Sequence, residues 1–192
     1  MMRSSRLFLI PLLVLALAGC TFVFHGIRGS GNVITQTRPV SAFTNIDFSG
    51  RGKVLIEQGD HDGLTVTTDD NLAPLLLSSV SGGTLYLGRR KGNEHIHASH
   101  GITYRVTVKN LKQMDISGVG DVEATKIDAK TLTISSSGVG TLTISGKADH
   151  LNLDVSGVGD YKGEGLKATA ATVTLSGVAT ANVYADKTLD AS

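Results

Sequence analysis

Three histidines near the middle of the chain have the spacing of metal ligands. His95, His97 and His100 fall within six residues, and imidazole is a common ligand of transition metals. On an extended strand His95 and His97 would share one face, and His100 could complete a three-nitrogen site. Glu94 is the only flanking carboxylate with ligand spacing, and ligand count alone is weak evidence for a metal. We therefore favour a solvated loop with polar histidines and keep the metal site as the alternative.

A basic segment, Arg89-Arg90-Lys91, precedes these histidines. Together they would form a local positive patch able to meet sugar acids or lipid phosphates. The alternative is a charged hairpin tip that keeps a sheet edge soluble. We favour the charged tip.

Two aspartates occupy equivalent places in a repeated motif. Asp121 and Asp160 are separated by Thr141 at the same place in the intervening copy. If the copies stack as neighbouring strands, the aspartates lie ~10 Å apart. Retaining glycosidases need about 5 Å, and this distance is near the outer limit for inverting enzymes. A calcium site would need more converging carboxylates.

No catalytic constellation stands out, and no Gly-x-Ser-x-Gly motif occurs. We therefore expect a non-enzymatic protein with no cofactor. The alternative is a polysaccharide lyase or hydrolase, because β-helices host such enzymes, although fold analogy is a weak warrant. The residues best placed to act in such an enzyme are Arg51, Lys53, Asp121 and Asp160.

The only cysteine, Cys20, has the setting of a lipid attachment site. Basic residues precede an apolar run over residues 7–17, which ends in Leu17-Ala18-Gly19-Cys20. The run is shorter than the ~20 residues that span a bilayer, so it predicts a removable signal. The ending closely resembles the bacterial lipobox.

The segment therefore predicts a signal peptide over residues 1–19, a lipidated tether over 20–28 and a domain over 29–192. Residue 21 is threonine rather than aspartate. By resemblance to sorted lipoproteins, that favours lipid anchoring at the outer membrane, with its periplasmic or surface face left open. Removing the thiol should release the protein.

Composition favours an architecture with a thin core. The chain has 23 glycines, no tryptophan and only 5% aromatic residues, so few large side chains can fill a thick interior. Its formal charge of +1 provides no global field to attract nucleic acid. The scarcity of large side chains favours a stacked solenoid.

A repeat with a period near twenty residues supports that architecture. Ser-Gly-Val-Gly recurs at residues 117, 137 and 156, and a looser copy begins at 176. We expect the glycines to turn the chain at the same place in each coil, and the valine between them to pack at the corner. These corner glycines are Gly118, Gly120, Gly138, Gly140, Gly157, Gly159 and Gly177.

Apolar and polar residues alternate between the motifs, which is the pattern of β-strands. Leu132 and Ile134 point one way and Thr133 the other, and later segments repeat this. Each repeat therefore predicts one coil of about twenty residues. In the first half, residues 69–75 could begin a short helical turn. Gly82-Gly83 predicts a tight hairpin, and residues 88–101 predict a polar loop.

The chain resembles the head GIN domain family of putative auto-transporter adhesins. The resemblance runs from about Gly29 to the end, and its motifs are Gly29-Ser30-Gly31-Asn32-Val33, Phe43-x-x-Ile46, Gly83-Thr84-Leu85, Val108-x-x-Leu111 and the Ser-Gly-x-Gly coils. It implies an all-β, single-stranded, right-handed parallel β-helix. The family's activity is essentially uncharacterised, so the resemblance implies a fold more than a function.

We therefore expect a cell-envelope lipoprotein whose solenoid acts as an adhesin-like binding or scaffolding module. Its partners would be the membrane, through the lipid, and an envelope glycan or protein. The chain ends in what resembles the start of another coil, Leu189-Asp190-Ala191-Ser192. An open edge there would allow self-association.

Overall fold

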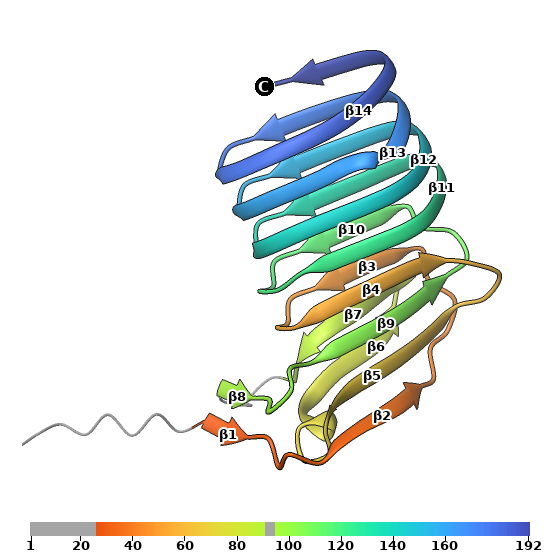
Figure 1. Ribbon diagram of the computed structural model, residues 1–192. Helices are drawn as coiled ribbons and strands as arrows, with labels where there is room; N and C mark the ends of the chain where they lie inside the picture. Colours follow the sequence, from red (N-terminus) through yellow and green to blue (C-terminus); the bar gives the residue numbers. More distant parts are fainter. Residues whose placement is uncertain (1–25, 91–94) are drawn as a thin grey trace, which may run out of the picture.

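The computed structural model describes residues 26–90 and 95–192, which form an all-β protein (Figure 1). The all-β expectation is confirmed. Cys20, the signal peptide and most of the tether lie outside the described residues, as do Lys91 and Glu94. None of the helical structure in the described ranges is long and apolar enough to cross a membrane.

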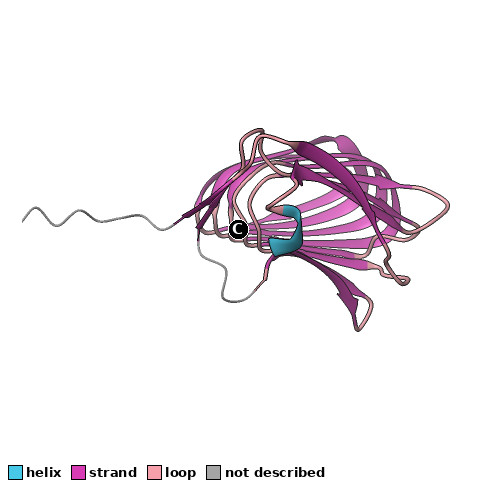
Figure 2. Ribbon diagram, turned by 90° about the horizontal axis from the view of Figure 1, so that it is seen from below, coloured by secondary structure: helices cyan, strands magenta, loops and turns pink. Residues whose placement is uncertain are grey.

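One 12-stranded sheet contains most of the chain. Its order is β2-β5-β9-β4-β11-β10-β3-β7-β6, and β12, β13 and β14 continue from β11. In the view of Figure 2 the sheet wraps almost completely around the interior. The core therefore lies inside a nearly closed, barrel-like wall.

The last four strands are long because each one bends around a corner of the wall. They are β11 (Val122–Ser136), β12 (Val139–Val155), β13 (Val158–Leu175) and β14 (Val178–Ala191). The first part of β11 pairs in parallel with β4 (Lys53–Gln58), and its last part pairs in parallel with β10 (Gln113–Ile116). Each coil thus contributes to two faces. We call the face containing β4 the groove face and the face containing β10 the back face.

From β11 to β13, successive coils stack with offsets of 19 or 20 residues. Leu132 lies opposite Leu151, and Leu151 lies opposite Ala171. All three are buried, because in-register parallel pairing keeps equivalent side chains on one side of the sheet. The alternating apolar residues therefore form continuous ladders through the interior.

The amino-terminal strands close the lower end of the stack. On the groove face, β2 (Val33–Arg38), β5 (Gly63–Asp69) and β9 (Thr103–Val108) pair antiparallel before β9 joins β4 in parallel. On the back face, β3 (Asn45–Phe48) lies between β10 and β7 (Thr84–Arg89). Antiparallel pairing of β6 (Leu76–Ser81) with β7 completes the sheet.

Two local features match their sequence signals. Gly82 and Gly83 join β6 to β7 with positive φ angles of 57° and 76°, as a tight hairpin requires. The expected helical turn is the 3-10 turn η1 (Ala73–Leu75). The half-buried Arg38 donates hydrogen bonds to the carbonyl oxygens of Leu76 and Ala73, so it fixes this turn to β2.

The expected polar loop around residue 95 contains a short strand. β8 (His95–His97) pairs in parallel with β1 (Gly26–Arg28). Alternating polarity over only three residues is too short a signal to predict a strand. The described chain therefore begins beside the histidine segment.

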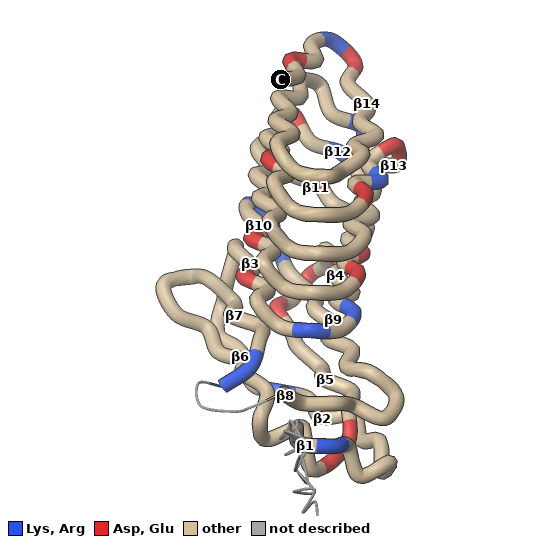
Figure 3. The backbone as a smooth tube through the Cα atoms, turned by 90° about the vertical axis from the view of Figure 1, so that its left-hand side faces the viewer, with Lys and Arg blue, Asp and Glu red and all other residues tan. Residues whose placement is uncertain are grey.

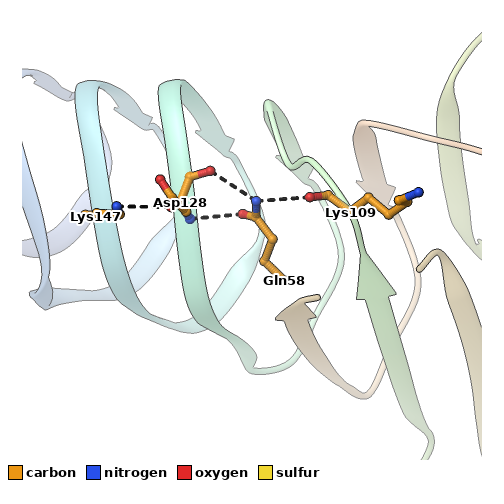
Figure 4. Close-up of polar contacts among 4 residues, drawn as sticks. All are labelled: Gln58, Lys109, Asp128 and Lys147. Atoms are coloured by element: carbon orange, nitrogen blue, oxygen red, sulfur yellow. Dashed lines mark hydrogen bonds and ion pairs between the residues drawn. The ribbon is translucent and has the colours of Figure 1, made fainter. Parts of the chain in front are cut away.

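The Gln58 side chain takes the place of backbone in one coil (Figure 4). Gln58 is the last residue of β4, after which the chain leaves the coil. Its Nε2 donates to the carbonyl oxygens of Lys109, at 3.1 Å, and Asp128, at 3.0 Å. Its Oε1 accepts from the Asp128 N–H at 3.0 Å. The amide thus supplies the donor and acceptor of a missing strand residue.

A second polar contact joins three distant segments at the lower end. The buried Asp69 carboxylate accepts from the backbone N–H groups of Gly31, at 2.8 Å, and Ser99, at 2.9 Å, and from the Ser99 hydroxyl. The neighbouring Asp70 accepts from the Ser30 hydroxyl at 2.5 Å and from Asn32 at 2.8 Å. We call this set the Asp69 clasp. It explains the Gly29-Ser30-Gly31-Asn32 motif as a structural element.

Candidate functional site

The groove face presents its outward side chains in straight rows. Strand pairing places Thr37 opposite Thr65, Thr65 opposite Arg105, and Arg105 opposite Leu55. Directly opposed residues in neighbouring strands have side chains within interaction distance. The same row continues across the upper coils through Glu123, Thr143, Lys162 and Asn182.

A groove of about 740 Å³ occupies the lower part of this face. The loop between β4 and β5, which projects on the right of Figure 1, forms one side of it through His61 and Asp62. Pro39 and Val40 also line it. We call it the Arg105 groove, and its other lining residues are Thr37, Arg38, Leu55, Ile56, Glu57, Gly63, Leu64, Thr65, Arg105, Val106, Thr107, Glu123 and Thr125.

Three carboxylates line the groove, and two of them have cationic partners; the third, Asp62, accepts a hydrogen bond from the Lys109 N–H at 2.9 Å. Glu123 lies 3.3 Å from Lys53, and Glu57 lies 2.6 Å from Lys126. The hydrogen bond and the charge of Glu57 raise the pKa of Lys126. Both pairs are largely exposed, so they contribute little stability. Their effect is to reduce the negative charge along this side of the groove.

Arg105 is the cation at the centre of the groove. No described carboxylate lies within ion-pair distance of it. It lies between Thr65 and Leu55 in the row, so a hydroxyl and an aliphatic side chain flank the guanidinium. A guanidinium donates several hydrogen bonds in a fixed planar geometry, and threonine hydroxyls both donate and accept. This combination suits a ligand rich in hydroxyl and acidic oxygen atoms.

The back face has different electrostatics. Asp47 lies opposite Asp115 in the neighbouring strand, and Asp154 lies two coils further along the same row. Partial burial, and then the charge of Asp115, raise the pKa of Asp47. An anionic ligand would meet repulsion here, so the Arg105 groove is the better candidate for binding one.

The corner glycines lie where successive coils touch. A Cβ added to Gly140 would lie 2.0 Å from the Gly120 carbonyl oxygen, and one added to Gly120 would lie 1.8 Å from the Gly52 carbonyl oxygen. Gly118, Gly138, Gly157 and Gly177 contact the preceding coil in the same way, and so does Gly159. The corners therefore leave no room for a side chain on these residues.

The valines between these glycines do not pack inward, which corrects the expectation for them. Val119, Val139, Val158 and Val178 are 38%, 49%, 51% and 77% exposed. Because the flanking glycines press against the preceding coil, the alternation of the strand turns each valine outward. We call these four residues the valine ridge.

The histidines do not converge on one point. His95 and His97 lie on β8, and the His97 ring is next to Gly26 of β1. The Nδ1 atom of His100 is hydrogen-bonded to the Ser99 hydroxyl at 2.9 Å. Within the described ranges no three His, Cys, Asp or Glu side chains are grouped closely enough to hold a metal ion.

The two aspartates of the repeat are likewise kept apart. Asp121 accepts a hydrogen bond from the Thr141 N–H at 3.1 Å, and Thr141 lies opposite Asp160. Thr141 therefore stands between the two carboxylates. Asp121 itself helps to hold one corner to the next.

Sequence reasoning did not single out Arg105. The alternation of Tyr104, Arg105 and Val106 placed its side chain outward, and burial of Tyr104 and Val106 agrees with that. Its neighbours Thr65 and Leu55 are about forty and fifty residues away in sequence. Only the strand order β5-β9-β4 brings them together.

Comparison with known proteins identifies the family. The family model "Putative auto-transporter adhesin, head GIN domain" matches residues 42–192. The chain therefore belongs to this family, and the resemblance seen in its sequence is confirmed. No curated protein matches the chain.

Solved structures share the fold. A putative adhesin from Bacteroides fragilis NCTC 9343 is similar with a TM-score of 0.72 and 24% identity, over 86% of each chain. A putative adhesin from Parabacteroides distasonis ATCC 8503 is similar with a TM-score of 0.54 and 17% identity, over 87% of this chain and 100% of the other.

Proposed function

We propose that this head GIN domain is a non-enzymatic binding module of the bacterial cell envelope, and that the Arg105 groove holds its ligand. Family membership and the similar adhesin structures support an adhesin-like role. The observation that carries the proposal is the cation at the centre of a groove of about 740 Å³. Around it, three strands present threonine hydroxyls.

We propose a carbohydrate chain with acidic groups as the ligand class. Arg105 would pair with a carboxylate or sulfate, because guanidinium forms strong charge-assisted hydrogen bonds with such groups. Thr37, Thr65 and Thr107 would hydrogen-bond sugar hydroxyls. Leu55 offers an apolar surface for the carbon-bound face of a ring. A straight row of side chains on a stiff sheet suits an extended polymer.

The finer architecture and the location belong to the same proposal. We propose a right-handed parallel β-helix as the scaffold, and the parallel pairing of equivalent residues in successive coils supports the parallel β-helix. The sequence over residues 1–20 supports a signal peptide, lipidation at Cys20 and anchoring at the outer membrane. A short tether would then hold the groove near that membrane.

Binding of polysaccharides by the purified, lipidated protein tests the proposal. We expect binding to acidic glycans, measured on an array, and at least about tenfold weaker binding by Arg105→Ala, because one charge-assisted contact is lost. Arg105→Lys should recover only part of it. Lys147→Ala is a matched control, since Lys147 is an exposed cation paired with Asp128 away from the groove. Equal binding by wild type and Arg105→Ala would reject the groove as the site.

A further inference from the structure

A second pocket, of about 240 Å³, lies between the first coil corner and the β6–β7 hairpin. Its basic side chains are Arg51, Arg89 and His95, and Tyr104 reaches it from the interior. We call it the Arg51 pocket.

The described residues that line the Arg51 pocket carry no negative charge. Two of them are arginines and one is a histidine, and none of these described residues is Asp or Glu. Arginine pairs with carboxylate and phosphate groups through parallel hydrogen bonds. The pocket therefore suits an anionic group with at least two acceptor oxygens.

The rest of the lining is aliphatic. Leu76, Ile96, Ile102 and Val119 provide branched hydrocarbon surface. Leu76 and Ile102 are already buried, so the exposed part of this surface lies on the half-buried Ile96 and on Val119, and a small inorganic anion would leave it in water. A ligand that joins an anionic group to a hydrocarbon chain would cover it and gain the free energy of apolar burial.

The valine ridge continues from this pocket up the stack. Arg51 lies opposite Val119, Val119 opposite Val139, Val139 opposite Val158, and Val158 opposite Val178. At about 4.8 Å per strand the four valines span ~14 Å. Figure 3 looks onto this edge, where the corners stack directly above one another.

Glycines border the ridge on both sides. Gly138 and Gly140 flank Val139, and Gly157 and Gly159 flank Val158. The outward neighbours of each valine along its strand lie two residues away, and on one side they are Asp121, Thr141 and Asp160. The valines therefore form a strip of hydrocarbon one residue wide beside a polar row. A line of exposed valines is one residue wide, so it fits a linear chain better than the broad face of a folded partner.

We propose that the Arg51 pocket and the valine ridge together bind a single-chain amphiphile whose head is a carboxylate or phosphate. The head lies against Arg51 and Arg89, and the hydrocarbon chain runs along Val119, Val139 and Val158. This site is separate from the Arg105 groove and does not depend on the function proposed for it. The chain enters the described structure at β1, beside His95 of the pocket, so a membrane anchor at Cys20 would place the pocket close to lipid.

Photolabelling of the lipidated protein in its own membranes tests the proposal. The probes are a diazirine fatty acid, a diazirine lysophosphatidic acid and a neutral diazirine alcohol of equal chain length. We expect both anionic probes to label peptides containing Val139 and Val158, and about tenfold less labelling in Arg51→Ala. Comparing the labelling by the fatty acid with that by the lysophosphatidic acid shows whether the pocket binds a carboxylate head or a phosphate head more tightly.

Two further variants separate the head from the chain. The double variant Val139→Ser, Val158→Ser should be labelled less by the long-chain probes, because their hydrocarbon contacts are lost. A short-chain phosphate should still reduce the labelling that remains, because the head site in the Arg51 pocket is unchanged. Lys147→Ala is the control and should label as wild type, since Lys147 is an exposed cation outside both sites. Each variant is first matched to wild type by circular dichroism, and the exposed positions make folding defects small. Labelling that is scattered over the surface, or unchanged in Arg51→Ala, would overturn the proposal.

Discussion

At the scale of single residues, a position can require glycine for two reasons: its backbone φ is positive, or a side chain there would clash with a neighbouring coil. Gly140 has a positive φ of 148°, and a Cβ there would meet the Gly120 carbonyl oxygen at 2.0 Å. Gly101 also has a positive φ, 80°, but a Cβ there would meet nothing within 4 Å. A side chain added at either glycine would strain the backbone, but only at Gly140 would it also clash with the preceding coil.

We therefore expect Gly101→Ala to cost about 1–2 kcal/mol of unfolding free energy, from left-handed backbone strain. Gly140→Ala should cost at least about 3 kcal/mol, because the coils must also move apart. Urea unfolding followed by circular dichroism measures both. Equal losses would mean that strain alone accounts for the glycines of the repeat.

At the scale of the elements, Gln58 shows how a coil stays hydrogen-bonded where the chain leaves it. Gln58→Ala removes contacts to Lys109 and Asp128 and should cost about 1–2 kcal/mol. Gln58→Glu should cost more at neutral pH, because a carboxylate cannot donate to the two carbonyl oxygens. The difference should shrink in acid, where the protonated side chain regains a donor.

The control for this element is Gln36→Glu, because Gln36 is an exposed residue of β2 and the substitution adds the same charge. Denaturant midpoints of the three variants between neutral and acidic pH provide the measurement. If Gln58→Glu matched Gln36→Glu at every pH, the bridging role of Gln58 would be wrong.

At the scale of the whole molecule, the Asp69 clasp joins the amino-terminal segment to the body. Hydrogen bonds from Ser99 and then from Gly31 hold the pKa of Asp69 below its ordinary value, and those from Ser30 and Asn32 do the same for Asp70. A carboxyl whose pKa is lower in the folded state stabilises it above the unfolded pKa, about 3.9. That stabilisation is lost as the pH falls through the folded value.

Asp69→Asn should therefore destabilise the protein at neutral pH, and its deficit should narrow as the pH falls below about 3.9. Proteolysis near residue 30 should rise in parallel, because the segment is held by this carboxylate. Asp149→Asn, at an exposed position, is the control and should follow wild type. A deficit that stays constant with pH would show that the charge of Asp69 is unimportant.

The sequence by itself determined the repeat, the all-β class and the inward ladders. These follow from local causes: alternation of Leu132, Thr133 and Ile134 fixes which side faces the core, and glycine at a recurring position marks each corner. The family followed from the same motifs. The sequence could not determine the direction of the corner valines, because that depends on how closely Gly118 and Gly138 approach the coil below.

Only the tertiary structure decided what the surface presents. Arg105 meets Thr65 and Leu55, and Arg51 begins the row that continues through Val119, because of the order in which strands pair. That order depends on contacts between segments tens of residues apart, which leave no periodic mark in the chain. The pairing of β8 with β1, which is another contact between distant segments, makes a strand of His95–His97, where the sequence favoured a loop.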